Sequence, residues 1–457
     1  MSEIMISFRE IQLADKPLLD SYLHKATAPI CDYTFANIYA WQTLYQTVWA
    51  EVEGALVVRF WLDGEYGYMV VGAEDYARVM TALLAEAKET GARLRLVGMT
   101  SGDAERFKAW AAENGGMERF AICDNPDYRD YIYSVEDLST LAGRKYQPKR
   151  NHINKFESKY TYEFKELTPE YFQECLCLEC RWQLRKAVMD NPEVAKEHKC
   201  KDTAEKIAIR RAFDAFDELG LYGGVLLVDG HVAAFTYGSA ISDDTFCTHI
   251  EKADSTMEGI FPMINRCFAR ALAERGFVWV NREEDMGLAG LRRSKNSFYP
   301  VRLQEKIGVR EITIRETECR ALWMEVFNDE REEVDRFLID IHREDNLLTH
   351  RENDRVVAML NIVKIDTDYG PTAYLYAIVT SPDFRGKGYA SALISQAIEL
   401  AREREYKAVM LIPSEISLVE YYKRFGFSEP TYKLDFSNGY DLGTGNTEHN
   451  IAMTLML

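Results

Sequence analysis

Long hydrophobic runs are missing from this chain. Its most apolar stretches, at residues 68–71 and 225–228, are far shorter than the ~18 residues that a membrane-spanning helix needs. The amino end, residues 1–5, also lacks the basic and apolar regions of a signal peptide. We therefore expect no membrane span and a cytoplasmic location.

Positive charge is in short supply as well. The 55 Lys and Arg residues are outnumbered by 73 Asp and Glu residues, and the formal net charge is −18. This balance argues against a protein whose whole surface binds nucleic acid, and it mildly favours cationic small molecules or protein amines as partners. It leaves room for a local basic site.

The cysteines lack the regular spacing of a disulfide framework. There are nine of them, an odd number, which fits reduced thiols better than disulfides. The one cluster, Cys175, Cys177 and Cys180, lies in a stretch that predicts a helix, whereas structural zinc needs a fourth ligand and looped ligand pairs. We expect buried helix cysteines there and no bound metal.

The chain does have the length and composition of a protein with several cores. Its 457 residues exceed one ordinary domain, and the prior of ~150 residues per domain suggests about three units. A hydrophobic content of 47% and a charged content of 28% are those of a globular protein. The sequence is therefore expected to divide into domains.

The most informative stretch joins a strand to a helix through a glycine turn. Residues 373–379 predict the strand, and the helix has apolar residues at helical spacing: Ala390, Leu393, Ile394, Ala397, Ile398 and Ala401. Between them lies Arg385-Gly386-Lys387-Gly388. The glycines let backbone N–H groups converge on an anion at the positive end of the helix dipole, and the two basic side chains add charge. Without its context, this tetrapeptide also fits an exposed surface turn.

In its context the turn resembles the acyl-CoA-binding motif of the GNAT acetyltransferase superfamily. That motif reads Arg or Gln, two residues, Gly, one residue, then Gly or Ala, and Arg385, Gly388 and Ala390 match it position by position. A strand at 408–413 and a short helix follow, ending in Tyr-Lys-Arg-Phe-Gly-Phe at 422–427, which is similar to the Tyr-x-x-x-Gly-Phe ending of the family.

One position departs from the family pattern. Glu415 stands where the family often has an Asn that contacts CoA. A customary side-chain contact to CoA is therefore not expected here.

The resemblance implies an acetyl-CoA-dependent N-acyltransferase. Backbone groups of Ile378 and Val379 would pair with the pantetheine, and the pyrophosphate would lie against Arg385, Gly386, Lys387, Gly388, Tyr389, Ala390 and Ser391. Because the amine attacks the thioester directly, the reaction needs proximity, a proton acceptor, and an acid for the departing thiolate. Tyr422 is expected to be the acid, with Tyr421 as the alternative. The base stays open between Tyr376 and a water held by a carboxylate.

Residues 1–305 carry other distinctive segments. Among them are Tyr-Thr-Phe-Ala-Asn-Ile-Tyr-Ala-Trp at 33–41, His-Ile-Glu-Lys-Ala-Asp at 249–254, Asn-Arg-Glu-Glu-Asp-Met-Gly-Leu at 281–288 and Gly-Leu-Arg-Arg-Ser-Lys at 290–295. They resemble a family of bacterial domains of unknown function that is related to the catalytic domain of lysylphosphatidylglycerol synthases. The resemblance implies a tandem of two acetyltransferase-like folds, as in Fem-type transferases, which use aminoacyl-tRNA.

Within this module, residues 245–281 repeat the order strand, loop, helix, strand. The strands are expected at 245–251 and 277–281, and the helix at 258–274. The loop at 252–259 has one glycine and two carboxylates, so it should repel a pyrophosphate. We expect that this module has lost CoA binding.

Ionisable residues gather just past the ends of these two strands. Glu251 and Lys252 follow the first, and Arg282, Glu283 and Asp285 follow the second. Ligands of open α/β sheets bind outside the carboxyl ends of strands, so these residues are candidates for a site. A surface ion-pair cluster would give the same pattern.

A second, basic group stands out on this acidic chain. It includes Lys149, Arg150 and His152, beside Pro148 at an expected helix start. Early helical N–H groups and basic side chains would point at a phosphate there, and we expect an anionic ligand between this group and Arg282. The open alternative is a solvated basic helix face.

These observations predict an α/β (α+β) protein with three acetyltransferase-like mixed-sheet units. Residues 1–306 would form a tandem module and residues 309–457 a GNAT domain, with strands at 299–303 and 311–315 on either side of the boundary. The GNAT domain would transfer an acetyl group from acetyl-CoA to an amine of a small molecule or protein. The alternatives are aminoacyl-tRNA-dependent aminoacyl transfer by the first module, with tRNA as partner, or a non-catalytic binding role for it.

Overall fold

The computed structural model describes residues 6–26, 28–62, 64–190, 203–436, 442–443 and 450–457. The chain is a mixed α/β protein with three mixed sheets, which confirms the predicted fold class. Its residues cluster into two compact units: a first unit of Met1–Phe107, Tyr128–Asp285 and Gly290–Lys306, and a second unit of Lys108–Asp127, Met286–Ala289 and Ile307–Leu457. In the part of the chain that is described, no helix has both the length and the apolarity to cross a membrane.

The amino-terminal part of the first unit is built on a meander. Strands β2 (Val48–Val52), β3 (Ala55–Leu62) and β4 (Glu65–Val71) pair antiparallel, and β1 (Arg9–Glu10) extends them. Helix α3 (Tyr76–Glu89) then connects β4 to the parallel strand β5 (Arg95–Met99). The remaining helices are α1 (Lys16–Leu23), α2 (Phe35–Tyr45) and α4 (Ser101–Glu113).

The second part of the first unit contains a sheet in the order β13-β7-β12-β11-β10-β9-β8. Its strands are β7 (Asp130–Ser134), β8 (Tyr162–Glu166), β9 (Tyr222–Val228), β10 (His231–Ala240), β11 (Thr245–Ala253), β12 (Trp279–Asn281) and β13 (Arg302–Gln304). Its helices are α5 (Val135–Thr140), α6 (Gln147–Lys159), α7 (Pro169–Asp190), α8 (Ala204–Asp214), α9 (Ile260–Glu274) and α10 (Ala289–Asn296).

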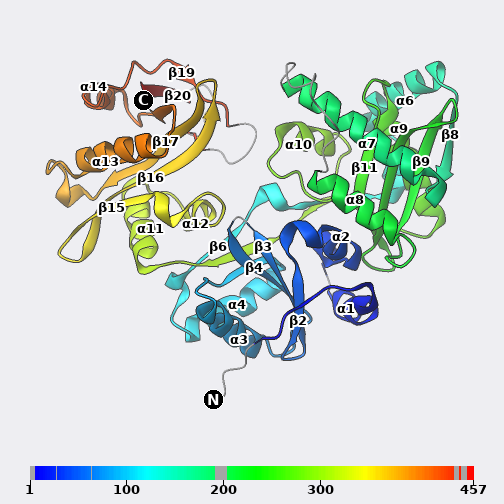
Figure 1. The fold of residues 1–457 in the computed structure, drawn as a ribbon, viewed down its shortest axis with the longest axis horizontal. Helices are drawn as coiled ribbons and strands as arrows, with labels where there is room; N and C mark the ends of the chain where they lie inside the picture. The colour runs from blue at the N-terminus through cyan, green and yellow to red at the C-terminus, as the bar shows by residue number, and fades with distance from the viewer. Residues whose placement is uncertain (1–5, 27, 63, 191–202, 437–441, 444–449) are drawn as a thin grey trace. The chain divides into compact units, whose positions relative to one another are not determined.

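Both faces of this sheet are covered by helices (Figure 1). Successive residues of a strand point to opposite faces. Val225 and Leu227 of β9 therefore pack in the core that contains Ile209 of α8, whereas Leu226 and Val228 pack in the core that contains Ile264 of α9. The continuous apolar run in β9 follows from this burial on two sides.

The second unit contains a sheet in the order β15-β16-β17-β18-β20-β19 and the antiparallel pair of β6 and β14. The strands are β6 (Phe120–Asp124), β14 (Ile307–Glu311), β15 (Leu347–Glu352), β16 (Arg355–Thr367), β17 (Gly370–Thr380), β18 (Ala408–Leu411), β19 (Tyr432–Lys433) and β20 (Ile451–Met456). The helices are α11 (Ile314–Phe327), α12 (Arg331–Asp340), α13 (Tyr389–Glu403) and α14 (Val419–Lys423).

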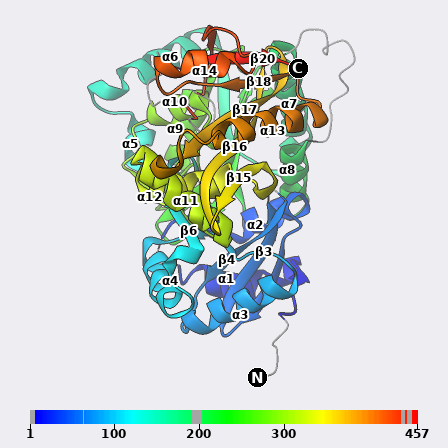
Figure 2. The ribbon, with the colours of Figure 1, turned by 90° about the vertical axis from the view of Figure 1, so that its left-hand side faces the viewer.

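Helix α13 lies across β16 and β17 (Figure 2). The face that it buries consists of Leu393, Ile394, Ala397, Ile398 and Ala401. Those positions carry the helical spacing read from the sequence, so the strand, turn and helix around the glycines form as predicted.

Two strands differ in their bounds from the prediction. The strand expected at 311–315 is β14, which ends at Glu311, because a capping box starts α11: Thr313 Oγ1 accepts from the N–H of Glu316, whose carboxylate accepts from the N–H of Thr313. The strand expected at 299–303 is β13, which starts at Arg302, and Tyr299 before it has a φ of 55° that no extended strand allows.

The cysteine cluster also differs from the expectation. Cys175 is buried in α7, but Cys177 is exposed. Cys180 is disulfide-bonded, so the expectation of reduced thiols is wrong for this residue.

Candidate functional site

Strand β17 leaves its neighbour β18 part-way along its length. The parallel pairing of the two strands ends at Tyr374 and Met410, although β17 continues past this point. On its other side, the register with β16 shifts around Ala377, whose φ of 50° lies in the left-handed region. A bulge of this kind bends a strand. The backbone of Ile378 and Val379, the predicted partners of the pantetheine, therefore lies beyond the end of the β18 ladder.

The glycine turn forms the start of α13. Gly386 and Gly388 have φ angles of 80° and 86°, and Gly388 is the N-cap residue of the helix, without a side-chain cap. Among the described residues other than their chain neighbours, no atom lies within 4 Å of the Cβ position at either glycine. The turn is therefore open beside the positive end of a 15-residue helix, which is a favourable place for an anion.

One carboxylate stands close to this turn. Lys387 Nζ lies 3.1 Å from Glu352 Oε2, and the hydroxyl of Tyr389 donates to the same oxygen at 2.9 Å. The hydrogen bond from Lys387 is the main cause that lowers the pKa of Glu352. Arg385 Nε donates to the carbonyl of Thr380 at 3.3 Å. The carboxylate of Glu352 thus lies beside the turn at which the sequence predicts the pyrophosphate of the ligand.

The two adjacent tyrosines of α14 have different surroundings. Tyr422 is 6% exposed and packs with Phe427 in the core between α13 and the sheet, and burial raises its pKa to about 12. The hydroxyl of Tyr421 lies 3.0 Å from that of Ser391 in the first turn of α13. Tyr422 is therefore protonated at neutral pH, as a general acid must be. Tyr421 contacts the first turn of α13, which follows the glycine turn.

A buried histidine in the second unit was not indicated by the sequence. His342 Nε2 lies 2.9 Å from Glu316 Oε1, and its Nδ1 lies 3.1 Å from Asn361 Oδ1. The ring of Tyr376, one of the two options for the base, lies tilted beside that of Phe337, with 5.2 Å between the ring centres, and Phe337 in turn lies beside the ring of His342. Glu316, Asn361 and His342 come from α11, β16 and the segment after α12, so only the folded chain brings them together.

In the first unit, the corresponding helix start is closed. Gly259 is the N-cap residue of α9 with a φ of 88°, and a Cβ there would lie 2.1 Å from the carbonyl oxygen of His152 in α6. Helix α6 thus covers the position that stays open at Gly388. This steric block adds to the acidic loop as a reason against CoA at α9.

The ionisable residues predicted near the strand ends separate into distinct pairs. Lys252 Nζ lies 2.7 Å from Glu205 and 3.2 Å from Glu179. Asp285 is buried and accepts from the hydroxyl of Tyr131 at 2.5 Å and from Arg292 at 2.7 Å. Most of this cluster is therefore a set of satisfied ion pairs.

Lys149 and Arg282 form the remaining basic pair. Arg282 lies 2.9 Å from Glu251, and Lys149 Nζ donates to Ser297 at 2.6 Å and lies 3.8 Å from the centre of the Phe298 ring. Burial first, and the charge of Arg282 second, lower the pKa of Lys149 to about 8, while the carboxylate of Glu251 opposes this shift. The side chains of Lys149 and Arg282 therefore place two positive charges near the same buried ring of Phe298.

The other predicted basic residues point elsewhere. Arg150 donates to the carbonyls of Leu141 and Gly143 just before its own helix. The side chain of His152 is 51% exposed and lies 3.7 Å from Glu258. Neither has a contact to Arg282 that would place it in the same group.

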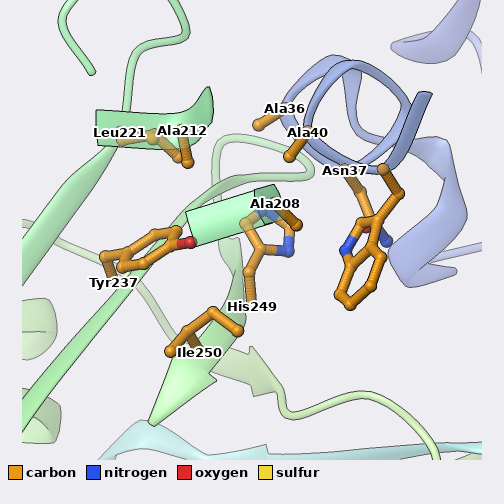
Figure 3. Close-up of a pocket in the computed structure, with 10 residues that line it drawn as sticks. Ala36, Asn37, Ala40, Ala208, Ala212, Leu221, Tyr237, His249 and Ile250 are labelled. Atoms are coloured by element: carbon orange, nitrogen blue, oxygen red, sulfur yellow. The ribbon is translucent and has the colours of Figure 1, made fainter. Parts of the chain in front are cut away.

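Two residues that were not predicted as site residues, His249 and Ser239, lie next to Glu283. His249 Nδ1 lies 3.0 Å from Glu283 Oε1, and its Nε2 lies 2.8 Å from Ser239 Oγ. His249 also reaches a small cavity, together with Tyr237 and Asn37 (Figure 3). Nearby, Lys306 Nζ is buried 2.7 Å from Asp130. The His249-Ile250-Glu251-Lys252 segment was noticed for its resemblance, but nothing local predicted which residues its histidine meets.

Two family matches divide the chain. Residues 26–309 match the family described as phosphatidylglycerol lysyltransferase, C-terminal, and residues 310–427 match the acetyltransferase (GNAT) family. Both matches support acyltransferase activity.

Individual proteins are similar to parts of this chain. A conserved protein of unknown function from Bacteroides thetaiotaomicron is 36% identical, with a TM-score of 0.60, over 67% of this chain and 100% of that one. The structure titled L-PGS from Bacillus licheniformis is 15% identical over 68% of this chain and 96% of that one, with a TM-score of 0.46. An uncharacterized N-acetyltransferase of Methanocaldococcus jannaschii is 42% identical over 59 residues, which is 12% of this chain. The chain spans only 26% of the length of that curated relative.

Proposed function

The chain belongs to the family of phosphatidylglycerol lysyltransferase C-terminal domains, and we propose that it joins such a domain to an acetyl-CoA-dependent N-acetyltransferase in its second unit. The observation that carries this proposal is the open glycine turn at Gly386 and Gly388, which starts α13 after the part of β17 that no longer pairs with β18. An extended pantetheine would lie along β17, and the pyrophosphate would lie against the turn, from Arg385 to Ser391.

The proposed reaction moves an acetyl group from sulfur to nitrogen. The neutral amine attacks the thioester carbonyl, the C–N bond forms, and the C–S bond breaks. The departing CoA thiolate takes a proton from Tyr422, and the amine nitrogen loses its extra proton to a base. The products are the N-acetyl amine and CoA. The acceptor is an amine of a small molecule or a protein, and the acidic balance of the chain favours a cationic one.

Gly388→Asp in the full-length chain tests this proposal. An aspartate would bring a side chain and a negative charge to the place proposed for the pyrophosphate, so CoA and acetyl-CoA should bind far more weakly in calorimetric titrations. Gly276→Asp is a matched control, because Gly276 has a φ of 89° and no atom within 4 Å of its Cβ position, like Gly388 with 86°. Equal CoA affinity in the two variants would overturn the CoA site.

We propose a second role for the first unit: binding of a phosphate-bearing ligand at Lys149 and Arg282, as aminoacyl-tRNA-dependent transfer would require. The observation that favours it is that two half-buried cations, Lys149 and Arg282, lie near the carboxylate of Glu251, so that two positive charges face one negative charge. Glu283 faces His249 and Lys252 is paired with Glu205, so both would shape the surroundings of this site without touching the phosphate.

Salt dependence of RNA binding tests this second role. Each phosphate contact with a single strand adds a slope of about −0.7 to the logarithmic salt dependence of binding. Lys149→Ala should flatten the slope for a short single-stranded RNA by about that amount, whereas Lys155→Ala on the same helix, where Lys155 is paired with Glu258, should not. An unchanged slope in Lys149→Ala would contradict the role. RNA binding without aminoacyl transfer would leave the first unit as a binding module.

A further inference from the structure

Three different donor side chains converge in the first unit, apart from Lys149 and Arg282. Cys247 and His249 both lie on β11, and His249 is the extra residue at a register shift against β10, where Tyr237 pairs with Ile250 and Gly238 with Thr248. Glu283 follows β12, which pairs in parallel with β11 so that Cys247 lies beside Asn281. The Cys247 sulfur, a ring nitrogen of His249 and a carboxylate oxygen of Glu283 all lie within 4.8 Å of one another.

The surrounding structure holds these donors in place. His249 Nε2 is bound to Ser239 Oγ at 2.8 Å, which leaves Nδ1 directed at Glu283. The ammonium of Lys295 donates to the carbonyls of Arg282, Glu283 and Glu284 at 2.5, 3.0 and 2.5 Å, and so fixes the turn that carries the carboxylate. Glu283 itself has a φ of 57°, an unfavourable value for a residue with a Cβ. Such strain tends to be kept where a side chain must point in one direction.

We propose that Cys247, His249 and Glu283 bind one divalent transition-metal ion, with zinc as the ion that best fits this donor set. Magnesium and calcium prefer oxygen ligands throughout, whereas thiolate with imidazole suits zinc and its neighbours. The thiolate and the carboxylate together balance the charge of a divalent ion, which matters because Cys247 is fully buried. Three protein ligands also leave a fourth position for water or another ligand.

In a neighbouring cluster of the same kind, a lysine ammonium occupies the place that a metal ion would take. Cys31, Asp130 and Glu284 also lie within 4.8 Å of one another, but the ammonium of Lys306 is 2.7 Å from Asp130 and 3.1 Å from Glu284. Lys306 therefore already supplies the cation of that cluster. No lysine or arginine contact of this kind to the Cys247, His249 and Glu283 donor atoms is found in the described part of the chain.

The distances around His249 also match those of a serine–histidine–carboxylate proton relay. The small size of the cavity beside His249 argues against a proton relay. Its volume of about 10 Å³ is enough for roughly one water molecule. Four of the residues that line it are alanines: Ala36, Ala40, Ala208 and Ala212 (Figure 3). An ester or amide substrate does not fit there, and a relay would not involve Cys247. The metal proposal revises the sequence-based expectation of no metal, which considered only the cysteines of α7.

Cobalt substitution of the full-length protein tests the site. After removal of bound metal by a chelator under reducing conditions, Co²⁺ should bind at one equivalent and give a thiolate-to-cobalt charge-transfer band. Cys247→Ser should lose the band. Cys31→Ser is the matched control, because Cys31 is also buried and packs in the same small cluster as Cys247, and it should keep the band.

A second variant guards against misfolding of Cys247→Ser. Ser239→Ala removes only the group that orients His249, and loss of such an outer partner typically weakens metal binding by about 10–100-fold without abolishing it. Elemental analysis of protein purified without chelators should find zinc near one equivalent. Failure of the parent protein to bind Co²⁺ or Zn²⁺ stoichiometrically, or an unchanged band in Cys247→Ser, would overturn the proposal.

Discussion

At the scale of single residues, the proposed role of the buried Tyr422 hydroxyl as the general acid can be tested. Its pKa of about 12 keeps it protonated, and its ring packs against Phe427. Tyr422→Phe preserves the packing, so CoA affinity should persist while turnover falls by the ~10²–10⁴ typical of one acid or base group. Release of the CoA thiol with the amine that supports the fastest turnover measures this.

Tyr421→Phe is the matched control for that experiment. It removes the hydroxyl that lies 3.0 Å from Ser391 and leaves Tyr422 intact. If turnover falls in Tyr421→Phe and survives in Tyr422→Phe, the acid is Tyr421 and the expected roles are exchanged.

Glu352 offers a prediction of the opposite sign. Its carboxylate accepts from Lys387 and Tyr389 and lies beside the turn proposed for the pyrophosphate. Glu352→Gln would remove a like charge and release Lys387 for the ligand, so CoA should bind more tightly by a factor of a few. Glu325→Gln, which breaks an exposed pair with Arg355, controls for the loss of one negative charge. Weaker or unchanged CoA binding in calorimetric titration of Glu352→Gln would count against the placement of the pyrophosphate.

Lys149 should make anion binding depend on pH in an unusual range. Burial first, and Arg282 second, lower its pKa to about 8, so the folded protein loses this charge well before an exposed lysine would. The charged form is disfavoured by folding, so its cost to stability is present below that pH and is relieved as the pH rises. An RNA ligand, by contrast, needs the charged form.

RNA affinity at constant salt is therefore expected to fall as the pH rises through about 8. Lys149→Arg should remove this fall, since a guanidinium stays protonated throughout. Filter-binding measurements on the full-length protein decide the point. The same pH profile in parent and Lys149→Arg would mean that another group titrates.

At the scale of elements, the same order of strand, turn and helix occurs in both units, but the starts of the two helices differ in accessibility. The turn before α13 is open, whereas α6 lies on the turn before α9. Gly259→Ala should therefore destabilise the protein more than Gly276→Ala, although the two glycines have φ angles of 88° and 89°. Both alanines cost about 1–2 kcal/mol for the left-handed backbone. Only the first also meets the carbonyl of His152, which adds about 1–3 kcal/mol of overpacking.

The midpoint of the urea transition measures that difference. Equal losses of stability in the two variants would mean that α6 moves away from α9 at little cost. In that case the amino end of α9 would be accessible, and the argument against CoA in the first unit would rest on its acidic loop alone.

Local patterns in the sequence predicted the elements that depend on local physics. The apolar spacing from Leu393 to Ala401 gave α13 and its buried face, and the paired glycines gave its open start. The end of β14 was predicted too far along the chain. The capping box of Thr313 and Glu316 starts a helix there, although the apolar residues around it favour a strand. A Thr three residues before a Glu could have shown this helix start.

The side-chain networks depended on pairings that no local pattern contains. Ser239, His249 and Glu283 meet because β10, β11 and the end of β12 lie side by side. Arg150 was expected beside Arg282, but its carbonyl partners before α6 lie closer along the chain. The sequence therefore pointed to the ends of β11 and β12, whereas no local pattern predicted which side chains meet there.

At the scale of the whole molecule, the two units are predicted to respond to different ligands. Acetyl-CoA should bind only the second unit, because the turn at Gly388 is open and the turn at Gly259 is covered. Hydrogen exchange of the full-length chain can locate the response. The amides of the first turn of α13, and those of β17 beyond Tyr374, should exchange more slowly with acetyl-CoA, whereas those at the start of α9 should not change.

The size of this protection follows from ligand linkage. Acetyl-CoA at ~100 times its Kd stabilises the bound state by about 2.7 kcal/mol, which slows exchange through opening of the second unit by about 100-fold. Gly388→Asp should abolish the effect, and Gly276→Asp should retain it. Protection at α9 that survives Gly388→Asp would mean that the first unit holds acetyl-CoA itself, because no ligand would remain at α13 to cause it.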